Sequence, residues 1–342
     1  MPFLTDVSLH DYSTMRLGGR AAYLTEIHSH SELTETLHWA QRQQLPVIMI
    51  GDGSNIVWRD EGCNGLILVN KIMHYEVFDE DGTNFYVTIG AGENWDGVVS
   101  KMVEAGLSGT ETLSLIPGTT GATPIQNVGA YGQEISDTLV SVEAYDTVTR
   151  SLVNIPNSDC IFGYRTSRFK TSDKGRFYIT AITLHLMKAN LQPPFYSSLQ
   201  NYLSEHKITN FTPAIIRKAI IDIRSHKLPN PSNIANTGSF FENPIVDEGT
   251  MTQIASSYDT IPNWRVDDSK VKLSAAWLIE QAGFKNFHDS QTGMATWPNS
   301  ALIFINEQAK STADLMKFKQ KVVDAVKAKF DVTLEQEPEL LP

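Results

Sequence analysis

The sequence predicts an α+β protein built from two or three domains. The chain has 342 residues, of which 41% are hydrophobic and 20% are charged. This composition is globular, and at roughly 100 to 200 residues per domain the length gives two or three domains, each with its own core. Helix and strand patterns occur in both halves of the chain. The composition changes after Met187, where Gln192-Pro-Pro-Phe-Tyr196 interrupts a strand pattern, so we place a boundary near residues 190–212.

In the first half, helical patterns alternate with short apolar runs. The capping box at residues 29–32 predicts a helix that ends before Pro46. A second helix is predicted over residues 95–105, with Gly106 as its C-terminal stop. The stretch 113–134 fits neither period and is expected to be an ordered loop. Strands are predicted at residues 47–50, 65–69, 85–89, 139–145 and 178–186.

The second half also mixes helices and strands. Thr212-Pro213 provides an N-cap and first-turn pair, and the isoleucines that follow form an apolar stripe that ends at Lys227-Leu-Pro229. Further helices are predicted over residues 272–282 and 312–330, flanking a strand at 301–305. Both halves are therefore expected to be α+β.

Charge, cysteine and histidine content exclude several classes of protein. The net charge of −11 argues against a surface for duplex nucleic acid. Two cysteines are too few for a disulfide framework or a four-thiolate zinc site, so a reducing compartment is the default. The nine histidines form no HExxH, and no metal site is expected. Without a leader pattern or a run of about 18 apolar residues, we expect a soluble, cytoplasmic protein with no membrane insertion.

Two glycine-rich segments are candidates for ligand contact. Gly51-Asp-Gly-Ser-Asn55 follows a predicted strand, and its small residues would let backbone amides approach a pyrophosphate, although a hairpin turn is the simpler interpretation. Residues 116–132 form a long charge-free loop that contains Gln126, Asn127 and Tyr131. Such loops are uncommon in compact domains unless they line a ligand. We therefore favour a wall along a flat ring over an ordered connection packed under a sheet.

Two other segments carry polar groups that suit catalysis. Arg165 lies between a glycine-tyrosine pair and two hydroxyls, which suits a carboxylate or a developing oxyanion, while an exposed ion-pairing arginine is the simpler interpretation. Ser239 stands beside a glycine and two aromatic residues, as a half-buried hydroxyl at a strand entrance. It is not part of a Gly-x-Ser-x-Gly elbow, so a hydrolase triad has little support. Residues 334–339 alone would be a solvated acidic tail.

Taken together, these segments resemble the UDP-N-acetylenolpyruvoylglucosamine reductases, the MurB flavoenzymes of bacterial cell-wall synthesis. Each match is weak alone, but the ordered set is specific and spans most of the chain. The matching segments are Met15-Arg-Leu-Gly-Gly19, Ile50-Gly-Asp-Gly-Ser-Asn55, Gly90-Ala-Gly92, Ile116-Pro-Gly118, Gln126-Asn-Val-Gly-Ala-Tyr-Gly132, Phe162-Gly-Tyr-Arg165, Gly238-Ser-Phe-Phe-Glu-Asn-Pro244, Ala276-Trp-Leu-Ile279 and Glu337-Pro-Glu339.

The resemblance implies an FAD-binding fold of the vanillyl-alcohol-oxidase (PCMH) type with a separate α+β substrate-binding domain. The FAD-binding region would cover residues 1–190, in two lobes of about 1–70 and 71–190. Residues 191–212 would be a tyrosine-bearing loop and linker, which is typical of the first type of the family. Residues 213–342 would form the substrate-binding domain with a catalytic C-terminal segment. A monomer is expected, with a small UDP-sugar substrate and no nucleic-acid partner.

The resemblance also implies a reaction. NADPH would reduce noncovalently bound FAD, which would pass a hydride to UDP-N-acetylglucosamine enolpyruvate and yield UDP-N-acetylmuramate. This step belongs to peptidoglycan precursor synthesis, and through it to cell wall biogenesis, cell shape and cell division. By the same match, Arg165 and Glu339 would stabilise the enolate charge, with Glu339 most useful if protonated, and Ser239 would deliver the proton.

The chain differs from the family pattern at its C-terminal end. The family ends in Leu-Glu-Pro-Glu, whereas this chain reads Leu334-Glu-Gln-Glu-Pro-Glu339. The two additional residues leave Glu335 and Glu337 as alternatives for the acid position. We prefer Glu339 because it follows Pro338, as the pattern requires.

Binding residues also follow from the resemblance. Lys227 would face the nucleotide diphosphate and Asn243 would make a nearby polar contact, while Tyr196 would lie on the loop that closes over the substrate. Trp264 replaces a tyrosine that many relatives have and could still stack on a sugar or base. The FAD pyrophosphate and isoalloxazine would be held by Gly51, Asp52, Gly53, Ser54, Asn55, Thr123, Ile125, Gln126, Asn127, Gly129, Ala130 and Tyr131.

Two other functions remain compatible with these features. An FAD oxidase of a sugar or alcohol would keep the fold, although no histidine lies in the glycine-rich loops for covalent flavin attachment. A nucleotide-sugar binding protein without catalysis would bind the UDP compound and show no turnover.

Overall fold

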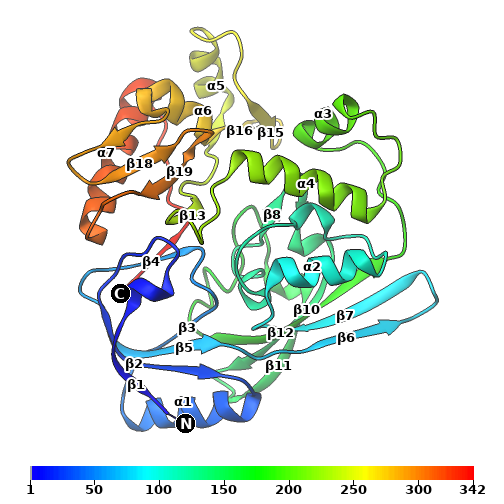
Figure 1. Ribbon diagram of the computed structural model, residues 1–342, viewed down its shortest axis with the longest axis vertical. Helices are drawn as coiled ribbons and strands as arrows, with labels where there is room; N and C mark the ends of the chain where they lie inside the picture. The colour runs from blue at the N-terminus through cyan, green and yellow to red at the C-terminus, as the bar shows by residue number, and fades with distance from the viewer. Residues whose placement is uncertain (1) are drawn as a thin grey trace. The chain divides into compact units, whose positions relative to one another are not determined.

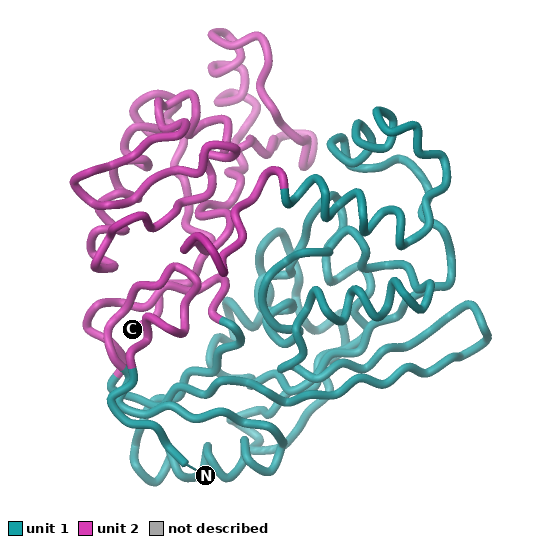
Figure 2. The backbone as a smooth tube through the Cα atoms, in the orientation of Figure 1, with its two compact units in different colours: residues 1–7, 21–52, 64–225 teal, residues 8–20, 53–63, 226–342 magenta. Residues whose placement is uncertain are grey.

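The computed structural model describes residues 2–342, and the chain forms two compact units (Figure 2). Unit 1 comprises Met1–Val7, Ala21–Asp52 and Asn64–Ser225, and unit 2 comprises Ser8–Arg20, Gly53–Cys63 and His226–Pro342. These units differ from the predicted boundaries, because two early segments join unit 2 and residues 213–225 join unit 1. Local patterns locate helices and strands, but they do not show which of them share a core. The functions assigned to the predicted domains stay predictions.

A four-stranded sheet of unit 1 uses strands from the first seventy residues. Helix α1 (His30–Arg42) covers one face of it (Figure 1), with Leu33 of the helix and Leu66 of the sheet buried in the shared core. The Ser29 side chain accepts the N–H of Glu32, which confirms the predicted helix start. The strand order is β1 (Leu4–Ser8), β2 (Arg20–Ile27), β5 (Cys63–Asn70) and β3 (Val47–Ile50).

An antiparallel five-stranded sheet forms the larger core of unit 1. Helix α2 (Trp95–Glu104) lies over this sheet (Figure 1) and buries Val98 and Met102 against it. Helices α3 (Ser197–Glu205) and α4 (Pro213–Lys227) share a smaller core, into which Tyr131 also packs. The strand order is β11 (Ser151–Pro156), β10 (Leu139–Asp146), β12 (Phe177–Met187), β7 (Asn84–Gly90) and β6 (Tyr75–Asp79).

Unit 2 contains two antiparallel sheets and three helices around one aromatic core. Phe240, Phe304 and Phe318 are buried in that core and have their rings in contact. One sheet has the order β13 (Asn236–Ser239), β19 (Ser300–Asn306), β18 (Met294–Trp297) and β17 (His288–Asp289); the other has β14 (Ile245–Asp247), β16 (Lys270–Leu273) and β15 (Asn263–Arg265). The helices are α5 (Glu248–Ala255), α6 (Ala275–Ile279) and α7 (Thr312–Phe330). A separate parallel pair joins β20 (Glu339–Leu341) to β4 (Ile56–Trp58).

Most of the predicted elements are confirmed, but the helix predicted over 272–282 begins too early. Lys272 and Leu273 belong to β16, and α6 starts after Ser274, whose side chain accepts the N–H of Trp277. Strand β16 and helix α6 are contiguous, so their apolar residues merged into one pattern. Helix α3 also lies inside the segment predicted as a loop and linker. In the described residues 2–342, no helix combines the length and apolar character needed to cross a membrane.

Candidate active site

The Gly51–Asn55 turn connects two different sheets, so the hairpin interpretation is wrong. Strand β3 before the turn pairs with β5, whereas β4 after it pairs with β20. The chain passes from unit 1 to unit 2 between Asp52 and Gly53, so Ser54 and Asn55 lie in unit 2. Within unit 1, the carboxylate of Asp52 lies 3.5 Å from the ammonium group of Lys71.

Three glycine-rich segments of unit 1 lie against one another. A Cβ on Gly51 would be 2.2 Å from the hydroxyl oxygen of Thr119, and a Cβ on Gly121 would be 2.5 Å from the Cβ of Ala91. The N–H of Gly121 donates to the Ala91 carbonyl oxygen at 2.9 Å. Only glycine permits backbones to approach this closely. The result is a wall of peptide groups, which suits a flat ring and a pyrophosphate, so these residues fit an FAD.

The second glycine-rich loop is ordered by its own polar side chains. It runs through a short 3-10 helix, η3 (Thr120–Ala122), to a small hairpin of β8 (Gly129–Ala130) and β9 (Gln133–Glu134). The buried Thr123 hydroxyl donates to the Thr120 carbonyl oxygen at 2.8 Å. Ile125 and Gln126 are half-buried. Other 3-10 helices are η1 (Leu9–Tyr12), η2 (Glu111–Leu113), η4 (Ile135–Asp137) and η5 (Asn157–Cys160).

Asn127, predicted as an FAD contact, has a fully buried side chain that binds the protein itself. Its amide nitrogen donates to the Glu134 carboxylate at 2.6 Å and to the Gly163 carbonyl oxygen at 3.2 Å. Its amide oxygen accepts the N–H of Ser136 at 3.1 Å. Any contact between Asn127 and FAD would therefore use the backbone.

Arg165 lies on a tight turn beside this loop. Gly163 and Thr166 exchange backbone hydrogen bonds of 3.1 and 3.2 Å, which places Tyr164 and Arg165 at the tip. The half-buried Arg165 guanidinium donates to the Gly129 carbonyl oxygen at 2.9 Å and lies 5.2 Å from the ring centre of Tyr164. The structure thus brings the predicted enolate-binding arginine against the predicted flavin loop, within unit 1.

Tyr131 and Tyr196 meet in unit 1, next to an arginine that the sequence analysis missed. Their rings are in edge-to-face contact, with centroids 5.9 Å apart. Burial raises the pKa of the Tyr131 phenol, while the positive charge of Arg224 and a hydrogen bond with it oppose this rise. Arg224 also donates to the Leu115 carbonyl oxygen at 3.3 Å, and burial lowers its pKa. No local pattern in the sequence marks this contact between Arg224 of α4 and a distant loop.

In unit 2, the segments that carry Ser239, Asn55 and Glu339 lie side by side. Ser239 is half-buried, as predicted, but it ends β13 instead of starting it. The N–H of Glu337 donates to the Phe240 carbonyl oxygen at 3.0 Å, and the N–H of Glu339 donates to that of Asn55, also at 3.0 Å. Because Arg165 belongs to unit 1, the convergence of all three catalytic candidates stays a prediction.

The remaining substrate-binding candidates lie in separate parts of unit 2. Lys227 is the exposed last residue of α4. The Asn243 amide oxygen accepts the N–H of Ala275 at 2.9 Å and so holds the start of α6. Trp264 is half-buried on β15, with the Lys272 ammonium 5.8 Å from its ring centre. Their roles in binding the substrate stay predictions.

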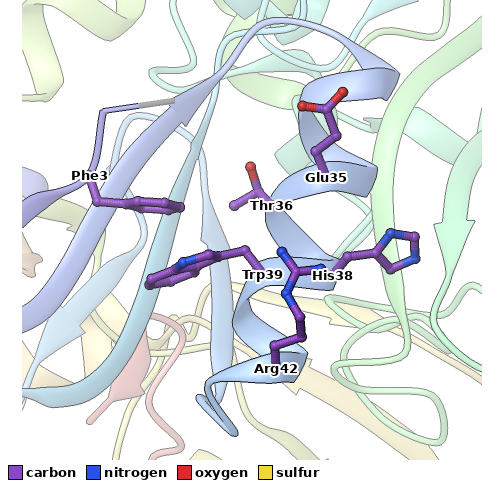
Figure 3. Close-up of a pocket in the computed structure, with 6 residues that line it drawn as sticks. All are labelled: Phe3, Glu35, Thr36, His38, Trp39 and Arg42. Atoms are coloured by element: carbon purple, nitrogen blue, oxygen red, sulfur yellow. The ribbon is translucent and has the colours of Figure 1, made fainter.

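A hollow of about 300 Å³ in unit 1 contains none of the predicted site residues (Figure 3). The ring of Phe3 stacks on that of Trp39 at 3.9 Å, and Tyr23 meets Trp39 edge-on. This stack attaches the N-terminal strand to α1, so we assign it a packing role. Its lining residues are Phe3, Glu35, Thr36, His38, Trp39 and Arg42. Across residues 2–342, no group of three or more His, Cys, Asp or Glu side chains is arranged to hold a metal ion.

Comparison with known families matches both parts of the chain. Residues 21–150 match a family described as an FAD binding domain. Residues 230–341 match a family described as the C-terminal domain of UDP-N-acetylenolpyruvoylglucosamine reductase.

Full-length relatives extend these matches. The chain is 36% identical to the UDP-N-acetylenolpyruvoylglucosamine reductase of Cupriavidus pinatubonensis, covering 97% of both proteins, and 38% identical to that of Alcanivorax borkumensis, covering 99% of this chain and 96% of the relative. The crystal structure of the Thermus caldophilus enzyme (MurB) has the same fold, with a TM-score of 0.67 and 21% identity over 100% of this chain and 98% of that one. The predicted fold class is thereby confirmed. The protein belongs to the UDP-N-acetylenolpyruvoylglucosamine reductases and is an FAD-dependent flavoprotein oxidoreductase.

Proposed function

We propose that Arg165, Ser239 and Glu339 carry the reaction of this family, the NADPH-consuming reduction of UDP-N-acetylglucosamine enolpyruvate to UDP-N-acetylmuramate. When bound, FAD supplies the hydride, which it takes from NADPH and delivers to the methylene carbon of the enolpyruvyl group. The observation that carries this proposal is the attachment of Glu339 to Asn55, the last residue of the candidate flavin turn.

Each of the three side chains has a separate task. Hydride addition leaves negative charge on the adjacent carbon, shared with the substrate carboxylate. The Arg165 guanidinium can bind that carboxylate with two hydrogen bonds, and a protonated Glu339 can donate a third. Ser239 then protonates the carbon. Because a serine hydroxyl is a poor acid in water, its neighbours must stabilise the alkoxide or pass a proton to it from solvent.

The cofactor and the substrate are each assigned to their own set of residues. We assign the FAD to Gly51–Asn55 and Thr123–Tyr131, because Gly51 packs closely against the Thr119 side chain and the Gly121 backbone against that of Ala91, which builds a wall of the required kind. We assign the UDP-sugar to Tyr196, Lys227, Asn243 and Trp264.

We place the reaction in the bacterial cytoplasm, in peptidoglycan precursor synthesis, where it serves cell shape and division. Cys63 and Cys160 form no disulfide, which suits a reducing compartment, and the relatives compared above come from bacteria. We further propose that the chain acts as a monomer without nucleic-acid partners.

An absorption spectrum of the purified protein tests the proposal directly. We expect a bound flavin whose absorbance falls on addition of NADPH without oxygen and returns when the enolpyruvyl nucleotide is added. Rapid return with oxygen alone would instead support an oxidase. A protein that binds the nucleotide but never reoxidises its flavin with it would be a binding protein, and one that binds no FAD would contradict the proposal entirely.

A further inference from the structure

We propose that Asn127 is a positioning residue that holds Arg165 for the reaction, and that Ser167 assists it. This inference rests on the catalytic role proposed above for Arg165. It assigns to Asn127 a task different from the cofactor contact expected from the sequence.

Alternate residues of the glycine-rich loop hold the turn that carries Arg165. The Ile125 carbonyl oxygen accepts the Ser167 hydroxyl at 2.6 Å. The Asn127 amide donates to the Gly163 carbonyl oxygen at 3.2 Å, and the Gly129 carbonyl oxygen accepts the Arg165 guanidinium at 2.9 Å. Loop residues 125, 127 and 129 thus each bind one part of the segment 163–167. Three hydrogen bonds join the loop to the turn, and the Arg165 guanidinium makes one of them.

The Asn127 site requires an amide. Its nitrogen donates to both Glu134 and Gly163, while its oxygen accepts the N–H of Ser136. An aspartate could accept but not donate, and it would face the Glu134 carboxylate. The backbone of Asn127 has φ +49°, a region that asparagine tolerates better than most residues. Both the backbone and the side chain therefore favour asparagine here.

The turn needs such support because Arg165 is in an unfavourable conformation. It has φ +52° at the third position of the turn, where glycine or asparagine is usual. Residues in this state persist when the surrounding structure holds them firmly, and they cluster at functional sites. The loop backbone confines the guanidinium as well, since a Cβ on Gly129 would lie 3.2 Å from the Arg165 Nη1. If the Asn127 contact is lost, the turn can relax and move the guanidinium.

Asn127→Asp is the test variant, and Asn157→Asp is its matched control. Asn157 also donates to two carbonyl oxygens, those of Ser136 and Leu139, at 2.7 Å each. Asn157 therefore holds the chain next to the Asn127 site, but these two hydrogen bonds do not involve the turn that carries Arg165. Both variants are compared for thermal unfolding midpoint, flavin spectrum, rate of FAD reduction by NADPH, and kcat.

We expect Asn127→Asp to keep its FAD and its rate of reduction by NADPH, while kcat falls about 100-fold, as is typical when a reacting group is misplaced by about 1 Å. Asn157→Asp should keep the kcat of the wild type, even where its unfolding midpoint falls as far as that of Asn127→Asp. In an Arg165→Lys background, Asn127→Asp should cause no further loss, because the two residues act as a unit. Independent, multiplying losses would overturn the inference, as would an equal loss of kcat in Asn157→Asp.

If Asn127→Asp fails to fold, Ser167 decides the question. Ser167→Ala removes the donor to Ile125 and should lower kcat, whereas Ser167→Thr keeps a hydroxyl and should recover most of it. Equal rates in the two variants would overturn the inference. Full activity of Arg165→Lys would instead show that the proposed catalytic role of Arg165 is wrong. Loss in Arg165→Lys with full activity in Asn127→Asp would overturn the positioning role alone.

Discussion

The backbone N–H of Glu339 donates a hydrogen bond to the carbonyl oxygen of Asn55 at 3.0 Å. This bond continues the parallel pairing of β20 with β4, in which Glu339 is in register with Ile56. The backbone of the candidate acid is therefore held within a strand pair. The pairing also favours Glu339 over Glu335, because Glu335 has an exposed side chain and lies four residues before the strand that pairs beside Asn55.

Alanine substitution of Glu335, Glu337 and Glu339 in turn should show which of them is the catalytic acid. We expect Glu339→Ala to lower kcat by about 10²-fold to 10³-fold, the usual cost of losing a group that stabilises developing charge. Glu335→Ala should leave kcat unchanged, and Glu337→Ala should change it only slightly. Steady-state rates with saturating NADPH and substrate measure this. A large loss in Glu335→Ala or Glu337→Ala, with normal activity in Glu339→Ala, would move the acid role to that residue.

Ser239→Ala should stop the reaction after the flavin has been reduced. Loss of a positioned proton donor costs about 10²-fold to 10⁴-fold in rate. NADPH should still reduce FAD at the normal rate, because that step does not use the serine. Stopped-flow absorbance resolves the two half-reactions. Ser256→Ala is the control, since the Ser256 hydroxyl is exposed and binds only within α5 and its cap; turnover by Ser239→Ala at the control's rate would remove Ser239 from the mechanism.

The sequence predicted what local chemistry determines. Ser29 caps α1, as the capping box indicated, and α7 occurs over the residues predicted for it. The glycine-rich segments were also identified, because close backbone approach requires glycine. The use of each side chain was not predictable, since the partners of Asn127 and Arg165 are up to 36 residues away. The pairing of Arg224 with Tyr131 was missed for the same reason: no local pattern marks a contact between a helix and a distant loop.

The ion pair between Arg217 and Asp96 should be a main attachment of α4 within unit 1. Arg217 donates to both carboxylate oxygens of Asp96, at 2.6 and 3.1 Å, and the Leu115 N–H adds a bond of 2.5 Å. Burial alone would raise the pKa of Asp96, but these donors hold it below its usual value. Only 12% of the Arg217 side chain and 28% of the Asp96 side chain are exposed. The pair is therefore sheltered, and removing one partner leaves the other poorly solvated.

We expect Asp96→Asn to reduce the free energy of unfolding by about 2 kcal/mol, in the range for hydrogen bonds to charged groups. Urea unfolding followed by circular dichroism measures the change. Asp222→Asn is the matched control, because Asp222 pairs with Lys218 where the side chains are 41% and 74% exposed. Exposed pairs contribute about 0 to 1 kcal/mol. Equal losses of unfolding free energy in the two variants would show that the sheltered Asp96 pair stabilises the fold no more than the exposed Asp222 pair does.

Acid should weaken unit 1 through the pairing of Asp146 with Arg176. Two guanidinium nitrogens donate to the buried Asp146 carboxylate at 3.0 and 2.8 Å, and these bonds lower its pKa from 3.8 to about 2. A carboxyl whose pKa is lower in the folded state stabilises the fold above its unfolded pKa, and that contribution disappears as the pH falls through the folded value. The stabilisation should therefore be complete above pH 3.8 and lost progressively towards pH 2.

Asp146→Asn cannot titrate, so its unfolding midpoint should lie below that of the wild type at pH 6 and approach it as the pH falls towards 2. Thermal unfolding at several pH values, followed by circular dichroism, measures the difference. Arg176→Gln removes the same pair from the other side. The gap between its unfolding midpoint and that of the wild type should also narrow as the pH falls from 6 to 2. The double variant should lose less than the sum of the single losses, because both substitutions break one interaction. A gap between wild type and Asp146→Asn that stays constant from pH 6 to pH 2 would show that the carboxylate is not stabilised by its charge.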